Sequence, residues 1–557
     1  MSVGRFSVIL LSLVLAAPAV SQSTPDQTNP DIVINGVNGA VAKKGDWKRA
    51  ESDHVVVFSR GSDDELKRVS KNIERLYRLM SRIYRRGDLT DPTVKPQVML
   101  VDTGKDFRAM QLANLRSSEG PYINAFTEQA YYDPREDGPI IAVSRSSQIV
   151  ELNTNRAYNL DCDDQLAAGA IDGCKSGYQA PAVQTWEQRL YAAYARHFIL
   201  TYVPAAYPRW YLDGVGVLFS TMTVRADGAI NYATPPENYI QVFRAYGDID
   251  VASVLTGKYL ATAPGKEGWT PYHAWLLTHY FVMSPLKPDR AKQFQAYMTA
   301  IHQGQSMADA AKVFGNLGTL QRELISYRDR DKAFARTAPG AATVADPIIT
   351  TLSPTASALV GLRVQLGSRL AGGDADAVLR RDGWVSQLRD AIGKLPYDAE
   401  AQLLLAEAEC RAGRPAECQA DAERVLAKAP DNIRALTWRG IALTDRALGG
   451  DAVDRTARLI LARAAIDKAL ALDGDAPLPL IARFQSYARA GEAVPDVAIA
   501  GMAKVIRELP AAPGPRLWLA AEMLRQGKAE VARRLVDMVI YGGYDSPEKA
   551  EATRLFK

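Results

Sequence analysis

Several signals are absent from this sequence, and each absence excludes a class of protein. After the N-terminal region, no stretch stays apolar for the roughly 18 residues that a membrane-spanning helix needs, so we expect no transmembrane segment in the mature chain. No basic run longer than a few residues occurs and the formal net charge is only +4, which argues against nucleic-acid binding. A Gly-x-Ser-x-Gly motif is also missing, so no nucleophile elbow indicates a serine hydrolase.

The N-terminus has the pattern of a secretory signal peptide, which we place at residues 1–21. Arg5 supplies the positive charge, Phe6–Ala17 forms the apolar core, and small residues place the cleavage site after Ala19 or Ser21. This core is too short to span a bilayer well, and no cysteine follows it, so a lipoprotein anchor is not expected. Export across the inner membrane then predicts a periplasmic protein.

The four cysteines fall into two pairs that are close in the sequence, Cys162 with Cys174 and Cys410 with Cys418. Their spacings match no zinc finger. Exported chains meet an oxidising environment, in which neighbouring thiols form disulfides. We therefore predict two local disulfides, Cys162–Cys174 and Cys410–Cys418, and the alternative is four buried thiols.

The length of 557 residues predicts more than one domain. Polar stretches rich in Pro and Gly divide the chain into a linker at 22–45, a domain at 46–335, a second linker at 336–353 and a helical region at 354–557. Apolar periodicity in the first domain predicts strands at His54–Ser59, Val98–Val101 and Ile140–Val143, and an amphipathic helix over Ser62–Gly87. Ser62 and Glu65 form a predicted capping box at the start of that helix.

The most informative stretch of the first domain predicts two consecutive helices, Leu190–Tyr202 and Trp210–Val224, with prolines in the turn between them. Ala193 and His197 stand four positions apart, so they share one face of the first helix. The segment Thr270–Met283 predicts a further apolar helix, which we expect to pack behind this pair.

This layout resembles the gluzincin branch of the zinc metallopeptidases, in the peptidase-MA-like form found in bacterial exported proteins. In that family the first helix carries His-Glu-x-x-His, and the second opens with Pro-x-Trp-x-x-Glu-Gly-x-Ala-x-x-Phe. Here the second part reads PRWYLDGVGVLFS, Pro208–Ser220, with Asp213 at the Glu position, and the first reads AYARH, Ala193–His197. The resemblance implies an α+β domain in which a small sheet backs the two helices.

The changed positions bear on the chemistry, because a catalytic zinc needs three protein ligands and an open position for water. Ala193 takes the place of the first His ligand and has no ligand atom. Tyr194 takes the place of the general base, and its phenol, with a pKa of about 10, is a poor base at neutral pH. His197 and Asp213 alone are not expected to hold zinc, so we predict no cofactor and no peptidase activity. We expect His197 and Asp213 to hydrogen-bond to each other across the former cleft.

Two alternatives remain open at this point. In the first, His197 is only a hydrogen-bonded polar residue on a packed helix. In the second, the protein is an active metal-dependent hydrolase with a non-standard site, in which His197 and Asp213 converge with Asp163 or Asp164 from the loop between Cys162 and Cys174.

The region 354–557 shows an internal repeat. Pro396 and Pro430 are 34 residues apart, and each unit predicts a helix, a turn and a helix, which resembles tetratricopeptide repeats. We count about five helix pairs and a short terminal helix from Pro547. Such an all-α solenoid presents a groove that binds a protein or peptide, and the alternative is that the repeats only brace the first domain. The sequence thus predicts an exported pseudo-peptidase that serves as a scaffold or interaction protein of the cell envelope.

Overall fold

The computed structural model describes residues 46–86, 94–110, 112, 130–146, 148–151, 156–159, 182–237, 239–261, 270–284, 288–370, 375–449, 452–541 and 547–556. The expected signal peptide and first linker lie outside the described residues, as do Asp163, Asp164 and the predicted Cys162–Cys174 disulfide. Within the part that is described, no helix combines the length and the apolar character needed to cross a membrane.

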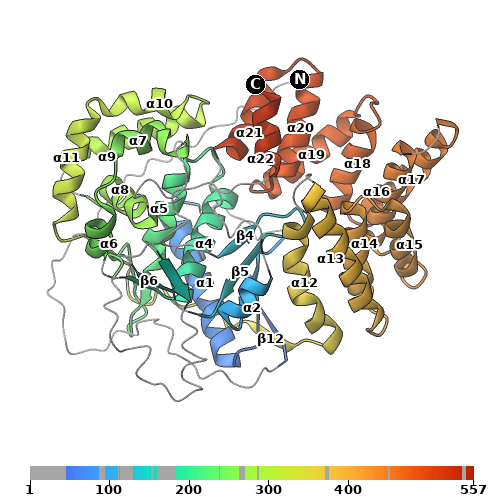
Figure 1. Ribbon diagram of the computed structural model, residues 1–557, viewed down its shortest axis with the longest axis horizontal. Helices are drawn as coiled ribbons and strands as arrows, with labels where there is room; N and C mark the ends of the chain where they lie inside the picture. The colour runs from blue at the N-terminus through green and yellow to red at the C-terminus, as the bar shows by residue number, and fades with distance from the viewer. Residues whose placement is uncertain are drawn as a thin grey trace.

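A six-stranded mixed sheet forms the centre of the first domain, with the order β12-β1-β2-β3-β5-β4 (Figure 1). Its strands are β1 Lys48–Glu51, β2 Val56–Ser59, β3 Gln97–Val101, β4 Tyr131–Asp133, β5 Ile140–Ser144 and β12 Ile348–Thr351. The three central strands β2, β3 and β5 run parallel, and they coincide with the three strands predicted from the sequence. The outer strands β1, β12 and β4 pair in the antiparallel sense.

The sheet is covered on both faces, and the period of two along its strands assigns each residue to a face. Residues Val57, Leu100 and Val143 belong to the large apolar core that they share with helices α1 (Asp63–Ile83) and α4 (Trp186–Tyr202). The alternate residues form a second apolar cluster on the other face: Phe58, Met99, Val101, Ile140 and Ala142, together with Phe107 of α2 (Gly104–Ala109) and Val360 and Val364 of α12 (Pro354–Leu370).

Helix α1 (Asp63–Ile83) begins where the sequence predicts, because the Ser62 hydroxyl accepts the Glu65 N–H at 3.2 Å. The predicted return bond from the Glu65 side chain is replaced by bonds to Arg145, at 3.1 and 3.2 Å. Glu65 therefore ties the first turn of α1 to the end of β5 instead of closing a capping box.

The remaining helices of the first domain surround the two predicted site helices. They are α2 (Gly104–Ala109), α4 (Trp186–Tyr202), α5 (Arg209–Ser220), α6 (Tyr239–Tyr246), α7 (Val251–Thr256), α8 (Pro271–Met283), α9 (Pro288–His302), α10 (Met307–Ala310) and α11 (Leu317–Arg328). Two small sheets complete the domain, one of β6 (Gln148–Glu151), β7 (Arg156–Asn159) and β8 (Ala182–Gln184), and one of β9 (Thr223–Val224), β10 (Ile230–Tyr232) and β11 (Ala335–Arg336). The second site helix is shorter than predicted, since it ends at Ser220 and Thr223–Val224 pairs with β10 as a strand.

The segment 336–353, predicted as a linker, is part of the first domain. Strand β12 lies in this segment and pairs with β1, with Thr351 opposite Lys48. Asp346 also forms ion pairs with Lys67 and Lys71 of α1. The polar composition that predicted a linker is that of an edge strand, whose outward side chains meet water.

An all-α array follows, and its five helix pairs and terminal helix confirm the predicted repeat architecture within the described residues. The pairs are α12 (Pro354–Leu370) with α13 (Ala375–Gly393), α14 (Ala399–Arg411) with α15 (Pro415–Leu426), α16 (Ile433–Leu448) with α17 (Ala452–Leu472), α18 (Pro477–Ala488) with α19 (Asp496–Glu508), and α20 (Pro513–Arg525) with α21 (Ala529–Ile540), before α22 (Pro547–Leu555). Gly413 makes the turn of the second pair with φ of 75°, a conformation that glycine adopts without strain. The predicted Cys410–Cys418 disulfide is present and joins α14 to α15, with the two Cα atoms 5.2 Å apart.

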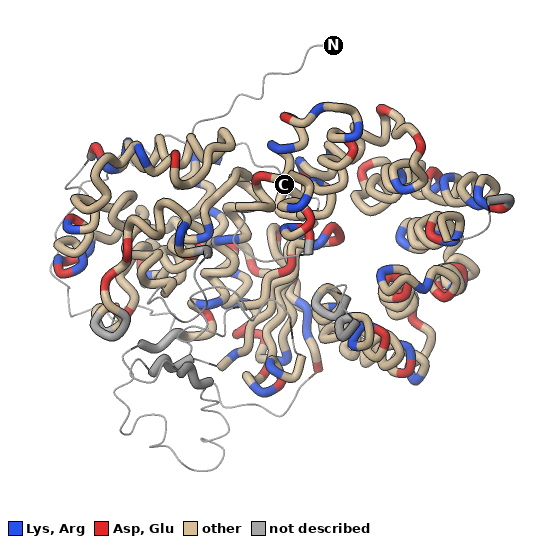
Figure 2. The backbone as a smooth tube through the Cα atoms, turned by 45° about the horizontal axis from the view of Figure 1, so that its top comes forward, with Lys and Arg blue, Asp and Glu red and all other residues tan. Residues whose placement is uncertain are grey.

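The array curves away from the first domain and returns to it. Figure 2 shows this course as an arc that ends at the C-terminus beside the first domain. At one end α12 covers the sheet, and at the other end Ala511 and Tyr541 pack against the apolar core of the first domain. The array is therefore attached to the first domain at both ends.

Candidate functional site

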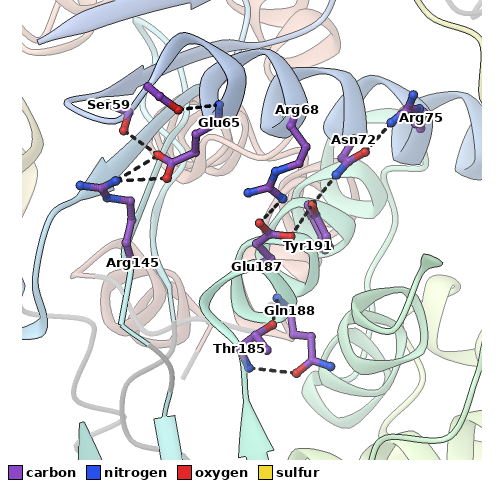
Figure 3. A network of polar contacts seen from close by, with 11 residues as sticks. Ser59, Glu65, Arg68, Asn72, Arg75, Arg145, Thr185, Glu187, Gln188 and Tyr191 are labelled. Atoms are coloured by element: carbon purple, nitrogen blue, oxygen red, sulfur yellow. Dashed lines mark hydrogen bonds and ion pairs between the residues drawn. The ribbon is translucent and has the colours of Figure 1, made fainter. Parts of the chain in front are cut away.

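Helix α4 carries three of the four predicted site positions, and its N-terminus is fixed by a capping box. The Thr185 hydroxyl accepts the Gln188 N–H at 3.2 Å, while the Gln188 side chain accepts the Thr185 N–H at 3.0 Å. Figure 3 shows this box below the contacts between α1 and α4. A reciprocal cap satisfies two of the free N–H groups at a helix start, so α4 begins at a defined residue.

A buried polar network then holds α4 against α1 (Figure 3). Arg68 of α1 pairs with Glu187, and the Tyr191 hydroxyl donates to the same carboxylate at 3.3 Å. The Asn72 amide donates to the Tyr191 hydroxyl at 3.0 Å. Burial raises the pKa of Glu187, and the charge of Arg68 opposes this rise. The network fixes the rotation of α4, and with it the direction in which the site residues point.

Helix α5 approaches both of its neighbours closely because glycine occupies two of its positions. A Cβ atom on Gly214 would lie 2.1 Å from the Thr278 hydroxyl of α8 and 2.5 Å from the Ala274 carbonyl oxygen. A Cβ atom on Gly216 would lie 3.1 Å from the Ala192 carbonyl oxygen of α4. Gly214 and Gly216 therefore set the spacing of α4, α5 and α8, and α8 lies behind the pair as the sequence predicts.

His197 is buried, with 1% of its surface exposed, and its hydrogen bonds involve one ring nitrogen. Its Nδ1 lies 3.1 Å from the hydroxyl of Tyr132 on β4 and 3.3 Å from the hydroxyl of Thr201, one turn further along α4. Its Nε2 has no hydrogen-bond partner among the residues that the structure describes. Burial lowers the pKa of His197 to about 3, so the ring is neutral at physiological pH.

Asp213 does not bond to His197, which corrects the pairing predicted from the sequence. Its Oδ1 accepts a hydrogen bond from Arg196 of α4 at 3.1 Å, and Arg209 lies 3.8 Å from its Oδ2. Because the carboxylate is 8% exposed, it needs a neighbouring positive charge, and two guanidinium groups provide it. The ion pair Arg196–Asp213 thus joins α4 to α5 directly.

The remaining two positions, Ala193 and Tyr194, are poorly suited to bind a metal ion. Ala193 is buried and carries no ligand atom. The Tyr194 hydroxyl has no hydrogen-bond partner within the described part of the chain, and burial raises its pKa well above its usual value. A neutral imidazole and an already paired carboxylate do not make up the three-ligand set of a catalytic zinc. The residues present at these positions therefore do not fit a gluzincin-type metal centre.

Sequence reasoning missed a second polar group close by. Of the described residues, Asp53, His54 and Glu74 form the single group of three possible metal-ligand side chains. Both oxygens of Glu74 already accept hydrogen bonds, from the Ser52 hydroxyl at 2.6 Å, the His54 N–H at 2.8 Å and the His54 ring at 2.7 Å. Burial by itself would raise the pKa of Glu74, but these bonds outweigh it and hold the pKa below its usual value. The group ties the β1–β2 turn to α1, and no local sequence pattern links residues so far apart in the chain.

Comparisons with known proteins add little to this geometry. No protein-family model matches the chain, and no curated protein sequence matches it. Among solved structures, the chain is similar to a thermophilic TPR protein from Thermus thermophilus, at 21% identity over 32% of this chain and 93% of that protein, with a TM-score of 0.29. The helix pairs themselves, not this likeness, establish the repeat architecture described above.

Proposed function

We propose that the protein is an exported pseudo-peptidase that works as a scaffold in the cell envelope and binds a protein partner through its helical array. The observation that carries the first half of this proposal is the pairing of Asp213 with Arg196 at 3.1 Å. In a working gluzincin-like site the corresponding carboxylate would neutralise a zinc ion, whereas here a guanidinium from the neighbouring helix is its counter-charge. The scaffold half of the proposal is supported by the stacked helix pairs, since such arrays commonly bind protein segments.

Zinc content and peptide cleavage test the proposal together. The mature chain should contain far less than one zinc per molecule and should not cleave a broad peptide library, with or without a chelator. The control is the triple variant Ala193→His, Tyr194→Glu, Arg196→Ala, which restores the two missing groups and frees Asp213. This variant should gain zinc first, because metal binding needs only the ligands, whereas turnover also needs the base.

Stoichiometric zinc in the unaltered protein, together with cleavage that a chelator abolishes, would establish the alternative of an active hydrolase. The periplasmic location is tested separately by fractionating cells that produce the full chain. An intact leader on protein recovered from the cytoplasm would contradict export.

A further inference from the structure

The turn between β4 and β5 extends from the sheet into the helical array. Arg135 in this turn is 4% exposed and is oriented by Asp133, whose carboxylate accepts its Nε–H at 2.5 Å. The same guanidinium donates to the carbonyl oxygens of Arg363 and Val364 on α12, at 2.6 and 3.0 Å. The turn is thus bound to the first helix of the array by side chain–backbone bonds.

Two acidic residues follow Arg135 and face arginines of successive repeats. Asp137 accepts a hydrogen bond from Arg363 of α12 at 3.3 Å, and Glu136 lies 3.7 Å from Arg411 of α14. Arg434 of α16 is the next arginine in this row, and its charge also acts on Asp137. Burial would raise the pKa of Asp137, but these arginines and Arg135 together hold it below its usual value. Arg363, Arg411 and Arg434 come from the first helices of three consecutive pairs, and we call them the arginine row.

Two glycines allow helices from opposite ends of the array to close around the turn. A Cβ atom on Gly367 of α12 would lie 2.1 Å from the Asp133 carboxylate and 2.9 Å from the Arg135 guanidinium. A Cβ atom on Gly514 of α20 would lie 2.8 Å from the Glu136 carboxylate. The turn therefore sits between the two ends of the arc, in contact with both.

The acidic residues are nevertheless imperfectly matched to the arginine row. Asp137 Oδ1 is buried and has no hydrogen-bond partner among the described residues. Burial raises the pKa of Glu136, Arg411 opposes this, and Glu548 of α22 adds to the rise. Arg411 makes its shorter contact within the array, to Glu407 at 3.0 Å. A ligand with better-placed carboxylates would therefore gain interactions that the turn does not make.

We propose that the arginine row is a binding site for a protein segment with two adjacent carboxylates in a tight turn, and that the β4–β5 turn occupies this site in cis. The proposal rests on the protein-binding role proposed above and names the chemistry of the partner. The cis turn acts at an effective concentration on the order of millimolar, so it masks the site against ligands of modest affinity. A partner binds by displacing the turn, and Glu136 and Asp137 indicate what its segment carries.

Shortening the turn exposes the site without removing a strand. Asp133 at the end of β4 pairs with Ile140 at the start of β5, and this is the pair nearest the turn. Replacing residues 134–139 by Asn-Gly therefore joins the two strands by a two-residue hairpin turn. The probe is a fluorescent peptide with the sequence of residues 131–142. In the control peptide, Gln replaces Glu136 and Asn replaces Asp137. Fluorescence anisotropy should show at least tenfold tighter binding of the acidic peptide to the shortened protein than to the unaltered chain. Arg411→Ala in the shortened protein should weaken that binding about tenfold, and the neutral peptide should not bind.

A second variant guards against misfolding of the shortened hairpin. In the double variant Glu136→Gln, Asp137→Asn, the turn keeps its shape and loses its charge, so the acidic peptide should bind several-fold tighter than to the unaltered protein. Equal binding of acidic and neutral peptides, or no binding to either variant, would overturn the proposal and leave the turn as a fixed brace. The two proposals can fail independently. Absence of peptide binding would contradict the arginine row as a binding site without bearing on the zinc content of the first domain. Zinc-dependent cleavage would contradict the pseudo-peptidase without bearing on the arginine row.

Discussion

At the scale of single residues, the ion pair of Arg196 and Asp213 explains how a carboxylate persists in the interior between two helices. Removing one member of such a pair leaves a buried charge without compensation, which costs more than the pair itself contributes. The pair also lies between helices that otherwise meet through apolar side chains and glycine. It therefore acts on the relative position of α4 and α5 more than on the stability of either helix.

A double-mutant cycle tests this pair. We expect Arg196→Met to lower the free energy of unfolding by about 2–3 kcal/mol, because Asp213 then keeps only the more distant Arg209. Adding Asp213→Asn should recover about half of the loss or more, since the unpaired charge is gone. Urea denaturation followed by circular dichroism measures the free energy of unfolding of both variants and of Asp213→Asn alone. Additive losses in the double variant would show that the two residues do not interact.

The buried histidines predict a specific pH dependence. Burial lowers the pKa of His197 to about 3 and those of His273 and His279 to about 4. The unfolded chain binds a proton at each ring near pH 6.5 while the folded chain does not, so stability is full above that pH and falls as the pH drops towards 4. Each histidine contributes a slope of about 1.4 kcal/mol per pH unit in that window.

Urea unfolding at several pH values between 4.5 and 7.5 measures this slope. His279→Asn should reduce this slope by about 1.4 kcal/mol per pH unit, which is the contribution of one proton. A slope that does not change when His279 is replaced would contradict the assignment of this ring as neutral in the folded state.

The site positions were predictable from the sequence only as far as their spacing along helices. Helical periodicity and the proline-containing turn placed Ala193, His197 and Asp213 on neighbouring helices, as the structure has them. The partners of those residues were not predictable, because Tyr132 approaches His197 from a strand 65 positions earlier. Arg196 was visible next to His197, but whether a helical side chain turns towards its neighbour depends on the packing angle, which local patterns do not encode.

At the scale of secondary-structure elements, α5 depends on glycine for its contacts with two helices. Gly214 faces α8 and Gly216 faces α4, so opposite sides of one helix turn carry no side chain. Glycine weakens an isolated helix by about 1 kcal/mol relative to alanine. Here that loss is offset by close packing, because the backbones approach to distances that a methyl group would prevent.

Gly214→Ala should therefore destabilise the protein by about 1–3 kcal/mol, because its Cβ atom would overlap Thr278. The matched control is Gly383→Ala in α13, where a Cβ atom meets nothing within 4 Å and helix propensity should raise stability by up to about 1 kcal/mol. Thermal unfolding of both variants compares them directly. Stabilisation by both substitutions would show that α5 and α8 are not closely packed.

The disulfide at the α14–α15 hairpin gives a further prediction for this scale. Cys410 and Cys418 are separated by eight positions, and closing so short a loop contributes about 2–3 kcal/mol through the unfolded state. We expect the double variant Cys410→Ala, Cys418→Ala to lose that amount under oxidising conditions. The unaltered protein measured with a reductant should behave like the variant. An unaltered protein that is equally stable with and without reductant would contradict the expectation.

Elements with strong apolar periodicity were predicted well, and elements defined by their neighbours were not. Strands β2, β3 and β5 are buried and apolar, so their sequences identify them. Strand β12, whose sequence is IITT, is mostly exposed and lies in a polar stretch, so only its pairing with β1 defines it. Thr223–Val224 continues the apolar pattern of α5, and the end of the helix at Ser220 is set by pairing with β10.

At the scale of the whole molecule, α12 belongs to two cores at once. Its Val360 and Val364 cover one face of the sheet, while Leu359 and Leu366 join the apolar cluster of the first repeats. A boundary at residue 353 therefore separates the sheet from one of its covering layers. Composition changes at this position along the chain, whereas the packed core continues across it.

Two shortened chains test this shared helix. A chain covering residues 22–353 should aggregate or unfold, because Met99 and Val101 lose the cover of α12. A chain covering residues 22–396 keeps α12 and α13 and should remain soluble, with a cooperative thermal transition. Size-exclusion chromatography and circular dichroism distinguish these outcomes. Equal behaviour of the two chains would show that α12 is dispensable for the sheet.

The pairing of β1 with β12 also constrains when the first domain can finish folding. Lys48 meets Thr351, about 300 residues further along the chain, and at typical synthesis rates about 15–60 s pass between the appearance of the two strands. Throughout that interval β1 has a free edge, and a free edge is a template for pairing with other chains. The first domain of a nascent chain is therefore completed only when synthesis has reached the array.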